Sequence, residues 1–592
     1  MSTLNWSSTN ATTCAASTGW SGTKSVTGTE QVGPLSATTT YTLECTGTGG
    51  TTSRSATVTV STAGNVIVSG RIEFQRPPFN AINQGLNLDA PVVSPARQVV
   101  VEAINPTTRA RVGAATVTDT SGDYSIEVPQ NTSMLISARA EMVSGTSAPT
   151  WNFKVLNNTN NRLYVLDGSA FDSGTANSTR DLLAPTGWNG TTYNTTRAAA
   201  PFAILDSVYR TKELILSAAP GTTFPALNLY WSPTNRTADG CTTDGNIGTT
   251  FYTSGASALD SDNCTPAVEL PAGIYILGDY AGGNGDTDEF DQHVIAHEFG
   301  HYVEDRFARS DSIGGTHGPD DRLDLRVAFG EGWGNAFSAM TLNDPVYRDS
   351  SRGITFDTGF NLESDSTTAE GWFSEASIGE ILWDLFDSVN DGADMISLGF
   401  TPLYSVMTGA QRTTDAMTSI YSFASGLRAT SGATQRAGIN GLLAGESISS
   451  AADAFGSGES NDGGNAMALP IYTDIARNQP LNVCSNGAED GSNELGSRRF
   501  LRLTLPSAAV LSITVQGAVG PGAPVNSQPA SDPDIYIYNQ GRLIDAGVTT
   551  TTQPGSSEMI QQRSYPAGVN ILEVHDWIGG ALPHCMTVSI AG

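Results

Sequence analysis

The feature that most constrains this 592-residue chain is the pentapeptide His297-Glu298-Phe299-Gly300-His301, which lies in a stretch with helical character at residues 287–309. Acidic residues crowd the start of that stretch, as the N-terminus of a helix favours. On an α-helix, positions i and i+4 share a face, so the two histidines can hold one ion. Glu298 lies about 100° around the helix and can reach a water on that ion. This HExxH pattern predicts a zinc site with His297 and His301 as ligands and Glu298 as general base.

A second helical stretch, VAFGEGWGNAFSAM at residues 327–340, carries a carboxylate that can complete such a site. Hydrolytic zinc sites use three protein ligands and keep one position open. Glu331 is the candidate third ligand. Asn335, one turn later on the same face, is a candidate to fix the tautomer of a ligand histidine. Each glycine in a helix costs about 1 kcal/mol relative to alanine. We therefore expect the two helices to pack closely where three glycines cluster, at Gly330, Gly332 and Gly334.

The sequences HEFGH, GEGWGN and, at residues 378–381, IGEI resemble the gluzincin peptidases, thermolysin-like in general and fungalysin-like in particular. The resemblance covers about the middle half of the chain. It implies a two-lobed α+β metallopeptidase domain. By position, it implies that His297, His301 and Glu331 bind zinc and that Glu298 is the base. Asn335 stands where the family usually has an aspartate that supports a ligand.

The chain departs from the fungalysin pattern at the residue expected to stabilise the oxyanion. Fungalysins have a histidine just before the IGE run, where this chain has Ala376 with Glu375 beside it. The donor would then be a tyrosine, an arginine or a main-chain N–H. We name Glu375 and Tyr404 as candidates, Tyr404 by analogy with gluzincins that use a tyrosine. Losing one oxyanion donor typically costs about 10²–10³ in rate.

Two further histidines have open roles. His293 lies one turn before His297 on the same helix face. Because a helix rises about 6 Å over four residues, three successive turns cannot easily converge on one ion. His293 therefore either supports the site, contacts substrate or is structural. His317 lies in the loop GGTHGPDD and either lines the cleft or has no role.

The acidic residues before the HExxH stretch form a candidate calcium site, because oxygen-rich loops can hold that ion. The alternative is that they simply favour the start of the helix. The four residues are Asp279, Asp286, Asp288 and Asp291, and a second acidic loop, DSVNDGAD, spans residues 387–394.

The formal charge of −29 argues against nucleic acid as a partner, since phosphate binding needs basic surface. No apolar run approaches the ~20 residues of a membrane-spanning helix. Met1 leads directly into polar residues, so we expect that a leader has been removed from a secreted or cell-surface protein.

The cysteines occur as two in each of three regions: Cys14 and Cys45, Cys241 and Cys264, Cys484 and Cys585. Six cysteines allow 15 pairings, of which one local pair per region is the simplest. Such a set fits an oxidising compartment, and the alternative is six reduced, buried thiols.

The pattern of strands and helices predicts strand-rich ends around a mixed central region, and with the resemblance it implies an α+β, thermolysin-like two-lobed metallopeptidase domain flanked by β-sandwich domains. Strand-like alternation dominates both ends of the chain, where it resembles bacterial immunoglobulin-like, prealbumin-like and pre-peptidase C-terminal domains. The predicted segments are an Ig-like domain at 1–62, a prealbumin-like domain at 63–148, the metallopeptidase at 149–475 and a pre-peptidase C-terminal-like sandwich at 476–592.

Within the third segment, residues 200–216 and 371–389 have helical periodicity. Three runs have strand character: 224–231, 247–253 and 273–280. In thermolysin-like enzymes an edge strand before the metal helix pairs with extended substrate. The sequence does not identify which of the three runs is that edge.

The leading hypothesis is a secreted, monomeric zinc endopeptidase that acts on a protein or peptide substrate. Its β-domains would bind a cell surface or matrix. A second hypothesis is a surface adhesion protein whose metal domain is degenerate, and the missing family histidine favours it. A third is a hydrolase that is specific for one partner.

Overall fold

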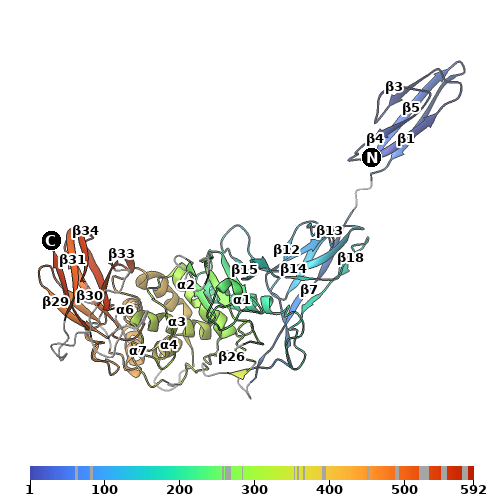
Figure 1. The fold of residues 1–592 in the computed structure, drawn as a ribbon. Helices are drawn as coiled ribbons and strands as arrows, with labels where there is room; N and C mark the ends of the chain where they lie inside the picture. The colour runs from blue at the N-terminus through green and yellow to red at the C-terminus, as the bar shows by residue number, and fades with distance from the viewer. Residues whose placement is uncertain are drawn as a thin grey trace.

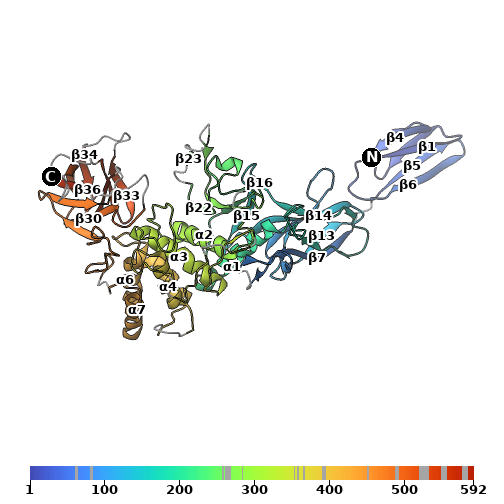
Figure 2. The ribbon, with the colours of Figure 1, turned by 60° about the horizontal axis from the view of Figure 1, so that its bottom comes forward.

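The computed structural model describes the chain apart from fifteen short segments: 61–63, 81–84, 256–258, 261–263, 265–267, 283–284, 353, 356–358, 365–366, 390–394, 450–452, 487–492, 519–531, 549–556 and 577–583. It confirms the predicted fold class, because a helical central region is flanked by several β-sheet units (Figure 1). The blue N-terminal unit stands apart from the rest of the chain in both ribbon views (Figures 1 and 2).

The N-terminal unit consists of two small antiparallel sheets that enclose an aromatic core. The rings of Trp6, Trp20 and Tyr41 meet edge to face, and a disulfide joins Cys14 to Cys45 across neighbouring strands. One sheet pairs β1 (Ser2–Ser7) with β4 (Thr27–Val32), and the other has the order β3 (Gly22–Lys24), β2 (Thr13–Ser17), β5 (Thr39–Gly47), β6 (Gly50–Val58).

The next unit is built on the long strand β7 (Asn65–Arg76). Its alternating buried and exposed residues place Val66, Val68 and Phe74 in the core. β7 pairs with antiparallel strands from the same region and with parallel strands that come about 110 residues later. The partners are β10 (Val92–Pro95), β13 (Asp123–Pro129), β19 (Ser178–Thr179) and β20 (Leu182–Ala184).

A ten-stranded sheet continues from this unit to the helices. The sequence boundary at 148/149 falls between β14 (Ser133–Val143) and β15 (Asn152–Asn157), which are hydrogen-bonded neighbours. The order along the sheet is β12 (Thr116–Val117), β11 (Val99–Ile104), β14, β15, β21 (Leu227–Trp231), β25 (Gly273–Ile276), β22 (Phe251–Thr253), with β16 (Arg162–Leu163), β17 (Val165–Asp167) and β18 (Phe171–Asp172) paired at its side. β22 is therefore the end strand, and it contacts the helix that carries the HExxH pentapeptide.

The helices pack beside this sheet and share one continuous hydrophobic core with it. An added Cβ on Gly300 would lie 3.2 Å from Cα of Gly334, so the two helices that carry the proposed ligands approach closely there. The helices are α1 (Ala200–Ala218), α2 (Gln292–Phe307), α3 (Leu325–Leu342), α4 (Glu375–Phe386), α5 (Phe400–Val406), α6 (Ile420–Thr430) and α7 (Ala433–Gly445), with short turns η1 (Thr242–Asp244) and η2 (Met407–Gln411). No described helix is long and apolar enough to cross a membrane.

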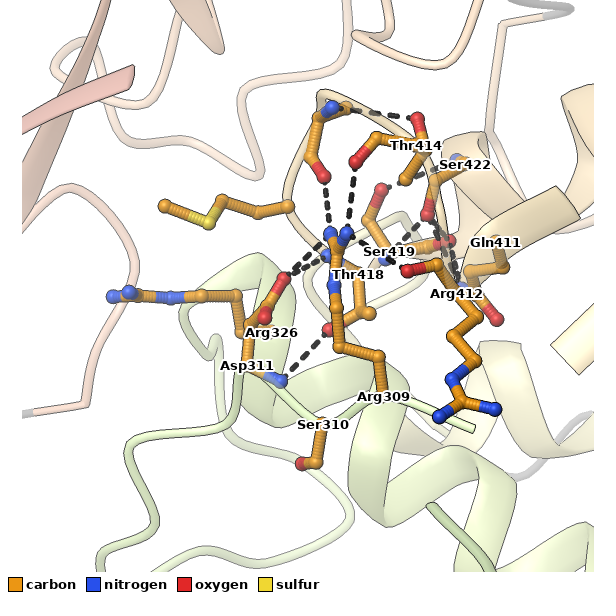
Figure 3. A network of polar contacts seen from close by, with 12 residues as sticks. Arg309, Ser310, Asp311, Arg326, Gln411, Arg412, Thr414, Thr418, Ser419 and Ser422 are labelled. Carbon is orange, nitrogen blue, oxygen red and sulfur yellow. Dashed lines mark hydrogen bonds and ion pairs between the residues drawn. The ribbon is translucent and has the colours of Figure 1, made fainter. Parts of the chain in front are cut away.

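A polar network fixes the end of α2 against the segment that precedes α6 (Figure 3). Arg309 donates to the carbonyl of Thr414 at 2.8 Å and to Asp311 at 2.9 Å. Asp311 in turn accepts from the amide of Thr418 at 2.8 Å. The position of α2 is thus tied to the helical half of the central region.

The C-terminal unit is a β-sandwich of two sheets around its own core. Cys484 and Cys585 join neighbouring strands, and Cys241 and Cys264 close a loop in the central region. One sheet has the order β28 (Tyr472–Ile475), β30 (Arg498–Leu505), β35 (Gly568–Asp576), β32 (Pro533–Asn539), β33 (Arg542–Gly547), and the other β29 (Leu481–Ser485), β36 (His584–Ala591), β31 (Ala509–Ala518), β34 (Ser557–Tyr565). Three minor pairs are β8 (Phe79–Asn80) with β9 (Gly85–Leu86), β23 (Leu259–Asp260) with β24 (Val268–Glu269), and β26 (Ser350–Ser351) with β27 (Ile354–Thr355).

A buried ion pair connects the C-terminal sandwich to α3. Arg326 is 1% exposed and donates to Glu573 of β35 at 2.7 Å, and Glu573 is fully buried. Arg498 of β30 also contacts Glu573.

Candidate metal centre

Three side chains from α2 and α3 converge on one point. Nε2 of His297 lies 3.1 Å from Nε2 of His301 and 3.2 Å from Oε2 of Glu331. Nε2 of His301 lies 3.3 Å from the same carboxylate oxygen. The i, i+4 spacing on α2 and the glycine contact with α3 produce this arrangement.

The tautomers of the two histidines direct their lone pairs to that point. Oδ1 of Asn335 is an acceptor 2.9 Å from Nδ1 of His297, and Oε2 of Glu304 lies 3.0 Å from Nδ1 of His301. Because both acceptors face Nδ1, that nitrogen carries the proton and Nε2 presents a lone pair. Glu304 was not among the residues predicted from the sequence. Its position three residues after His301, on the same helix face, was an available signal.

The donor set fits a zinc ion. Two lone pairs and a carboxylate oxygen at mutual distances of 3.1–3.3 Å repel one another unless a proton or a metal ion lies between them. Tetrahedral zinc, with ligands at about 2.0–2.1 Å, separates neighbouring ligand atoms by about 3.4 Å. His297, His301 and Glu331 form a group that could hold a metal ion. Two imidazoles and one carboxylate are a ligand set of catalytic zinc sites.

Glu298 lies between the ligand group and the end strand of the sheet. Its Oε2 accepts a hydrogen bond of 2.7 Å from the amide of Tyr252 in β22. Burial raises the pKa of the Glu298 carboxyl, while the neighbouring His297 and His301 lower it. A carboxylate held in this way and shifted toward neutral pH is suited to exchange protons.

His317 also reaches the ligand group, although its loop is distant in sequence. Its Nε2 lies 3.3 Å from Oε2 of Glu331, and its Nδ1 lies 2.8 Å from Oε2 of Glu375 at the start of α4. Burial lowers the pKa of His317, but the hydrogen bond to Glu375 and the charges of Glu331 and Glu375 outweigh this effect and raise it to about 9. His317 can therefore carry a proton on both nitrogens, and Glu375 is its acceptor.

The other candidates lie elsewhere. Nδ1 of His293 is 3.2 Å from the hydroxyl of Ser338, and burial lowers its pKa to about 3. His293 is thus a neutral, buried residue that contacts Ser338 and not the ligand group. Tyr404 of α5 is 6% exposed and stacks on Phe400. None of the contacts among the described residues joins Tyr404 to the ligand group.

The acidic residues before α2 have different surroundings. Oδ1 of Asp279 accepts from the amides of Ala281 and Gly282 in a turn. Asp291 accepts from the amide and the hydroxyl of Ser350. Asp286 and Asp288 cluster instead with Asp349, which the sequence did not predict. Of the second acidic loop, residues 390–394 lie outside the described part of the chain.

A family model, that of the Mycolysin C-terminal domain, matches residues 284–441. This range includes α2, α3 and α4, and therefore every residue of the metal centre except Tyr252 of β22. No curated protein matches the chain.

Solved structures give remote matches. The pre-peptidase C-terminal domain of collagenase from Bacillus anthracis is 13% identical, with 20% of this chain and 93% of that chain covered and a TM-score of 0.15. PliG from Aeromonas hydrophila, a periplasmic inhibitor of g-type lysozyme, is 14% identical, with coverages of 20% and 96% and a TM-score of 0.12. Likeness at these scores carries no further conclusion.

Proposed function

We propose that the chain is a secreted zinc endopeptidase in which Glu298 is the general base. The observation that carries this proposal is the convergence of two imidazole lone pairs and a carboxylate oxygen at 3.1–3.3 Å, with the carboxylate of Glu298 on the next helix position. The match of residues 284–441 to the Mycolysin C-terminal domain supports it.

The protein groups have separate tasks in peptide hydrolysis. Zinc held by His297, His301 and Glu331 would polarise the scissile carbonyl and lower the pKa of the attacking water toward ~7. Glu298, held by the amide of Tyr252, accepts the proton of that water and then passes it to the leaving amine. Asn335 and Glu304 keep the two ligand imidazoles in the required tautomer.

His317 is suited to stabilise the oxygen that gains negative charge. With Nδ1 donating to Glu375, a protonated His317 has its Nε2–H directed toward the ligand group. A donor so placed is worth about 10²–10³ in rate. The adhesion hypothesis rested on the lack of a histidine in this role, so the position of His317 reduces its support.

The end strand β22 is the candidate surface for the substrate backbone. Among the described strands, β22 pairs only with β25, so its other edge has no strand neighbour, although the amide of Tyr252 there donates to Glu298. An extended peptide that adds to this edge gains main-chain hydrogen bonds with little side-chain selection. The residue that orients Glu298, Tyr252, belongs to this strand, so substrate binding and catalysis would share one element.

Secretion and the accessory roles are part of the same proposal. Three disulfides favour an oxidising compartment. A net charge of −29 disfavours nucleic acid as a partner. The β-domains would then hold a monomeric enzyme at a cell surface or matrix.

The deciding experiment is casein cleavage by the zinc-loaded chain beside its Glu298→Ala variant. We expect cleavage by the parent and none by the variant, with equal zinc content. A folded, zinc-loaded parent that cuts neither casein nor a denatured protein mixture would contradict a general endopeptidase. Cuts at very few sites in that mixture would favour the hydrolase that is specific for one partner.

A further inference from the structure

A cavity of about 190 Å³ lies beside the start of α2, where the end of β7 and the segment after α3 meet it. None of the proposed zinc ligands is among its described lining residues. Phe79, Leu86 and Leu342 form an apolar part of its wall. The charged residues of the wall are three arginines and two aspartates: Arg76, Arg210, Arg348, Asp291 and Asp344. Sites for small molecules combine apolar walls with a few placed polar groups in this way.

Arg76 brings buried donors to the cavity that have no acceptor. The residue is 7% exposed, and its Nη2 donates to the carbonyl of Ala203 at 2.8 Å and to Asp206 at 3.3 Å. Its Nε and Nη1 are buried and have no hydrogen-bond partner among the described residues. Burial lowers the pKa of Arg76 to about 10, so the guanidinium is still charged at neutral pH. A buried charged donor without an acceptor is costly, so an acceptor in the cavity would stabilise the fold.

Gln292 and Arg348 add donors from two other segments. Nε2 of Gln292 and Nε of Arg348 are buried, and neither has a partner in the part of the chain that the structure describes. Arg348 uses Nη1 for Asp344 and for the carbonyl of Val346, and this leaves its Nε over. Because α2 begins at Gln292, the positive end of the helix dipole also favours a negative ligand here. Four unsatisfied donor atoms around one cavity indicate an anion.

The two aspartates of the wall do not satisfy these donors, since each already has its own. Asp344 is paired with Nη1 of Arg348. Asp291 accepts from the amide and the hydroxyl of Ser350 at 3.1 and 2.7 Å. Burial and the charge of Asp349 raise the pKa of Asp291 well above its ordinary value, which reduces the negative charge that Asp291 contributes. The cavity therefore keeps an excess of positive groups.

His293 supplies an acceptor to the same cavity. The hydroxyl of Ser338 donates to the carbonyl of Asn335 at 2.8 Å, which uses its single hydrogen. Ser338 must therefore accept from Nδ1 of His293, 3.2 Å away. Because His293 is neutral, its Nε2 carries a lone pair, and this atom is buried without a partner among the described residues. A fitting ligand thus has several acceptor oxygens and one donor.

We infer that the cavity binds inorganic hydrogen phosphate. Its oxygens accept from Arg76, Gln292 and Arg348, and its hydroxyl donates to Nε2 of His293. Sulfate has the same shape but carries no proton at neutral pH, so it would turn an oxygen toward that lone pair. A phosphate monoester has its second pKa at about 6 and is largely without a proton at neutral pH. The site therefore distinguishes free phosphate from both.

Phosphate here would act on the helix that carries both proposed histidine ligands. His293 contacts Ser338, the hydroxyl of Ser338 bonds to the backbone of Asn335, and the side chain of Asn335 contacts His297. The cavity is thus connected to the metal centre by a short chain of hydrogen bonds. A bound phosphate would hold β7, the start of α2 and the segment after α3 together.

The test counts bound phosphate. The zinc-loaded parent and Arg348→Gln are dialysed to equilibrium against radioactive phosphate, with chloride keeping the ionic strength constant. We expect the parent to bind one phosphate more than the variant, because any phosphate on the zinc ion is common to both. Phosphate should also raise the melting temperature of the parent saturably and more than that of the variant. Sulfate and methyl phosphate should displace this extra phosphate about tenfold more weakly than unlabelled phosphate, or worse, since each leaves the lone pair of His293 unpaired.

Arg502→Gln is the matched control. The side chain of Arg502 is 23% exposed, against 21% for Arg348, and each pairs with one aspartate and lies over a phenylalanine ring. Arg502 lies in β30 and does not line the cavity, so its variant should bind as much phosphate as the parent.

Two results would overturn the inference. Equal phosphate binding by the parent and Arg348→Gln would remove the site. Displacement by sulfate or methyl phosphate as strong as that by phosphate would remove the assignment to free hydrogen phosphate. If Arg348→Gln does not fold, Gln292→Leu takes its place, because Gln292 is only partly buried and its variant also lacks one of the four donors.

Discussion

Nδ1 of His317 lies 2.8 Å from Oε2 of Glu375, although 58 residues separate the two in sequence. The contact places a loop histidine beside the proposed zinc ligands and fixes which of its nitrogens faces them. The chain thus has an imidazole at the metal centre even though its sequence lacks the one that fungalysin-like proteins place before the IGE run.

Replacement of His317 should separate catalysis from metal binding. We expect His317→Ala to lower kcat about 10²–10³-fold, because one oxyanion donor is lost, while zinc content stays unchanged. Peptide hydrolysis and metal analysis on the same preparations measure both. Tyr404→Phe is the control and should retain parental activity, since Tyr404 packs on Phe400 in the core. A loss of zinc in His317→Ala would show instead that His317 is a ligand.

Two glycines of α3 should respond in opposite ways to alanine. A Cβ on Gly334 would lie 2.7–2.8 Å from three ring atoms of His297, so Gly334→Ala should displace that imidazole and reduce both zinc binding and activity. A Cβ on Gly330 has 3.6 Å or more to every neighbour, so Gly330→Ala should keep zinc and gain up to about 1 kcal/mol in helix stability. Zinc content and urea unfolding of the two variants test this. Equal zinc content and equal stability of the two variants would mean that α2 and α3 do not pack as described here.

Asn335 should affect zinc affinity although it is not itself a proposed ligand. Asn335→Ala removes the acceptor 2.9 Å from Nδ1 of His297 and should weaken zinc binding about 10–100-fold. Asn335→Asp retains an acceptor and should retain affinity. Competition with a chromogenic chelator gives both constants. Parental affinity in the alanine variant would exclude this role.

The buried pair of Arg326 and Glu573 predicts a contribution to stability that depends on pH. Burial raises the pKa of Glu573, but the charges of Arg326 and Arg498 outweigh this effect and lower the pKa from 4.5 to about 2. Because the folded pKa is the lower one, the contribution is complete above about pH 4.5 and is lost as the pH falls toward 2. Its size is on the order of 3 kcal/mol.

Glu573→Gln isolates this contribution, because the other carboxylates titrate equally in both proteins. We expect the variant to be less stable than the parent at pH 7 by about 3 kcal/mol, since Arg326 keeps Asp324 but loses its second buried carboxylate. The difference should shrink as the pH falls from about 4.5 to 2. Urea titrations followed by circular dichroism at several pH values measure it. A difference that does not change with pH would contradict the predicted role of the charge.

Local sequence patterns predicted the helices well, although α3 is buried on every side from Leu325 to Met340 and not on one face only. The stretch expected at 327–340 is α3 (Leu325–Leu342), and that at 200–216 is α1 (Ala200–Ala218). The i, i+4 spacing on α2 brings His297 and His301 together. In the structure, Glu331 and Asn335 of α3 lie beside them. Helical spacing was therefore sufficient for the two histidines of the candidate metal centre, whereas Glu331 was named because such a site needs a third ligand and because its motif resembles the gluzincins.

Loop residues could not be predicted in this way, since their neighbours are set by tertiary packing alone. His317 and Asp349 belong to loops with no repeating pattern, and each meets partners from distant segments. The sequence also did not predict that one sheet continues across residue 148. The pairing of β14 with β15 is a contact between two strands, and no change in composition marks it. Tyr404 looked suitable because of its chemistry, but α5 directs it into the core.

The ion pair between Arg326 and Glu573 has a consequence for how the protein is made. Glu573 is the 247th residue that a ribosome adds after Arg326. Until then the helix of Glu331 contains a guanidinium whose distant acidic partner has not been synthesised. A message that stops short of β35 would therefore yield a chain with every proposed zinc ligand, in which Arg326 of the Glu331 helix has Asp324 but lacks Glu573.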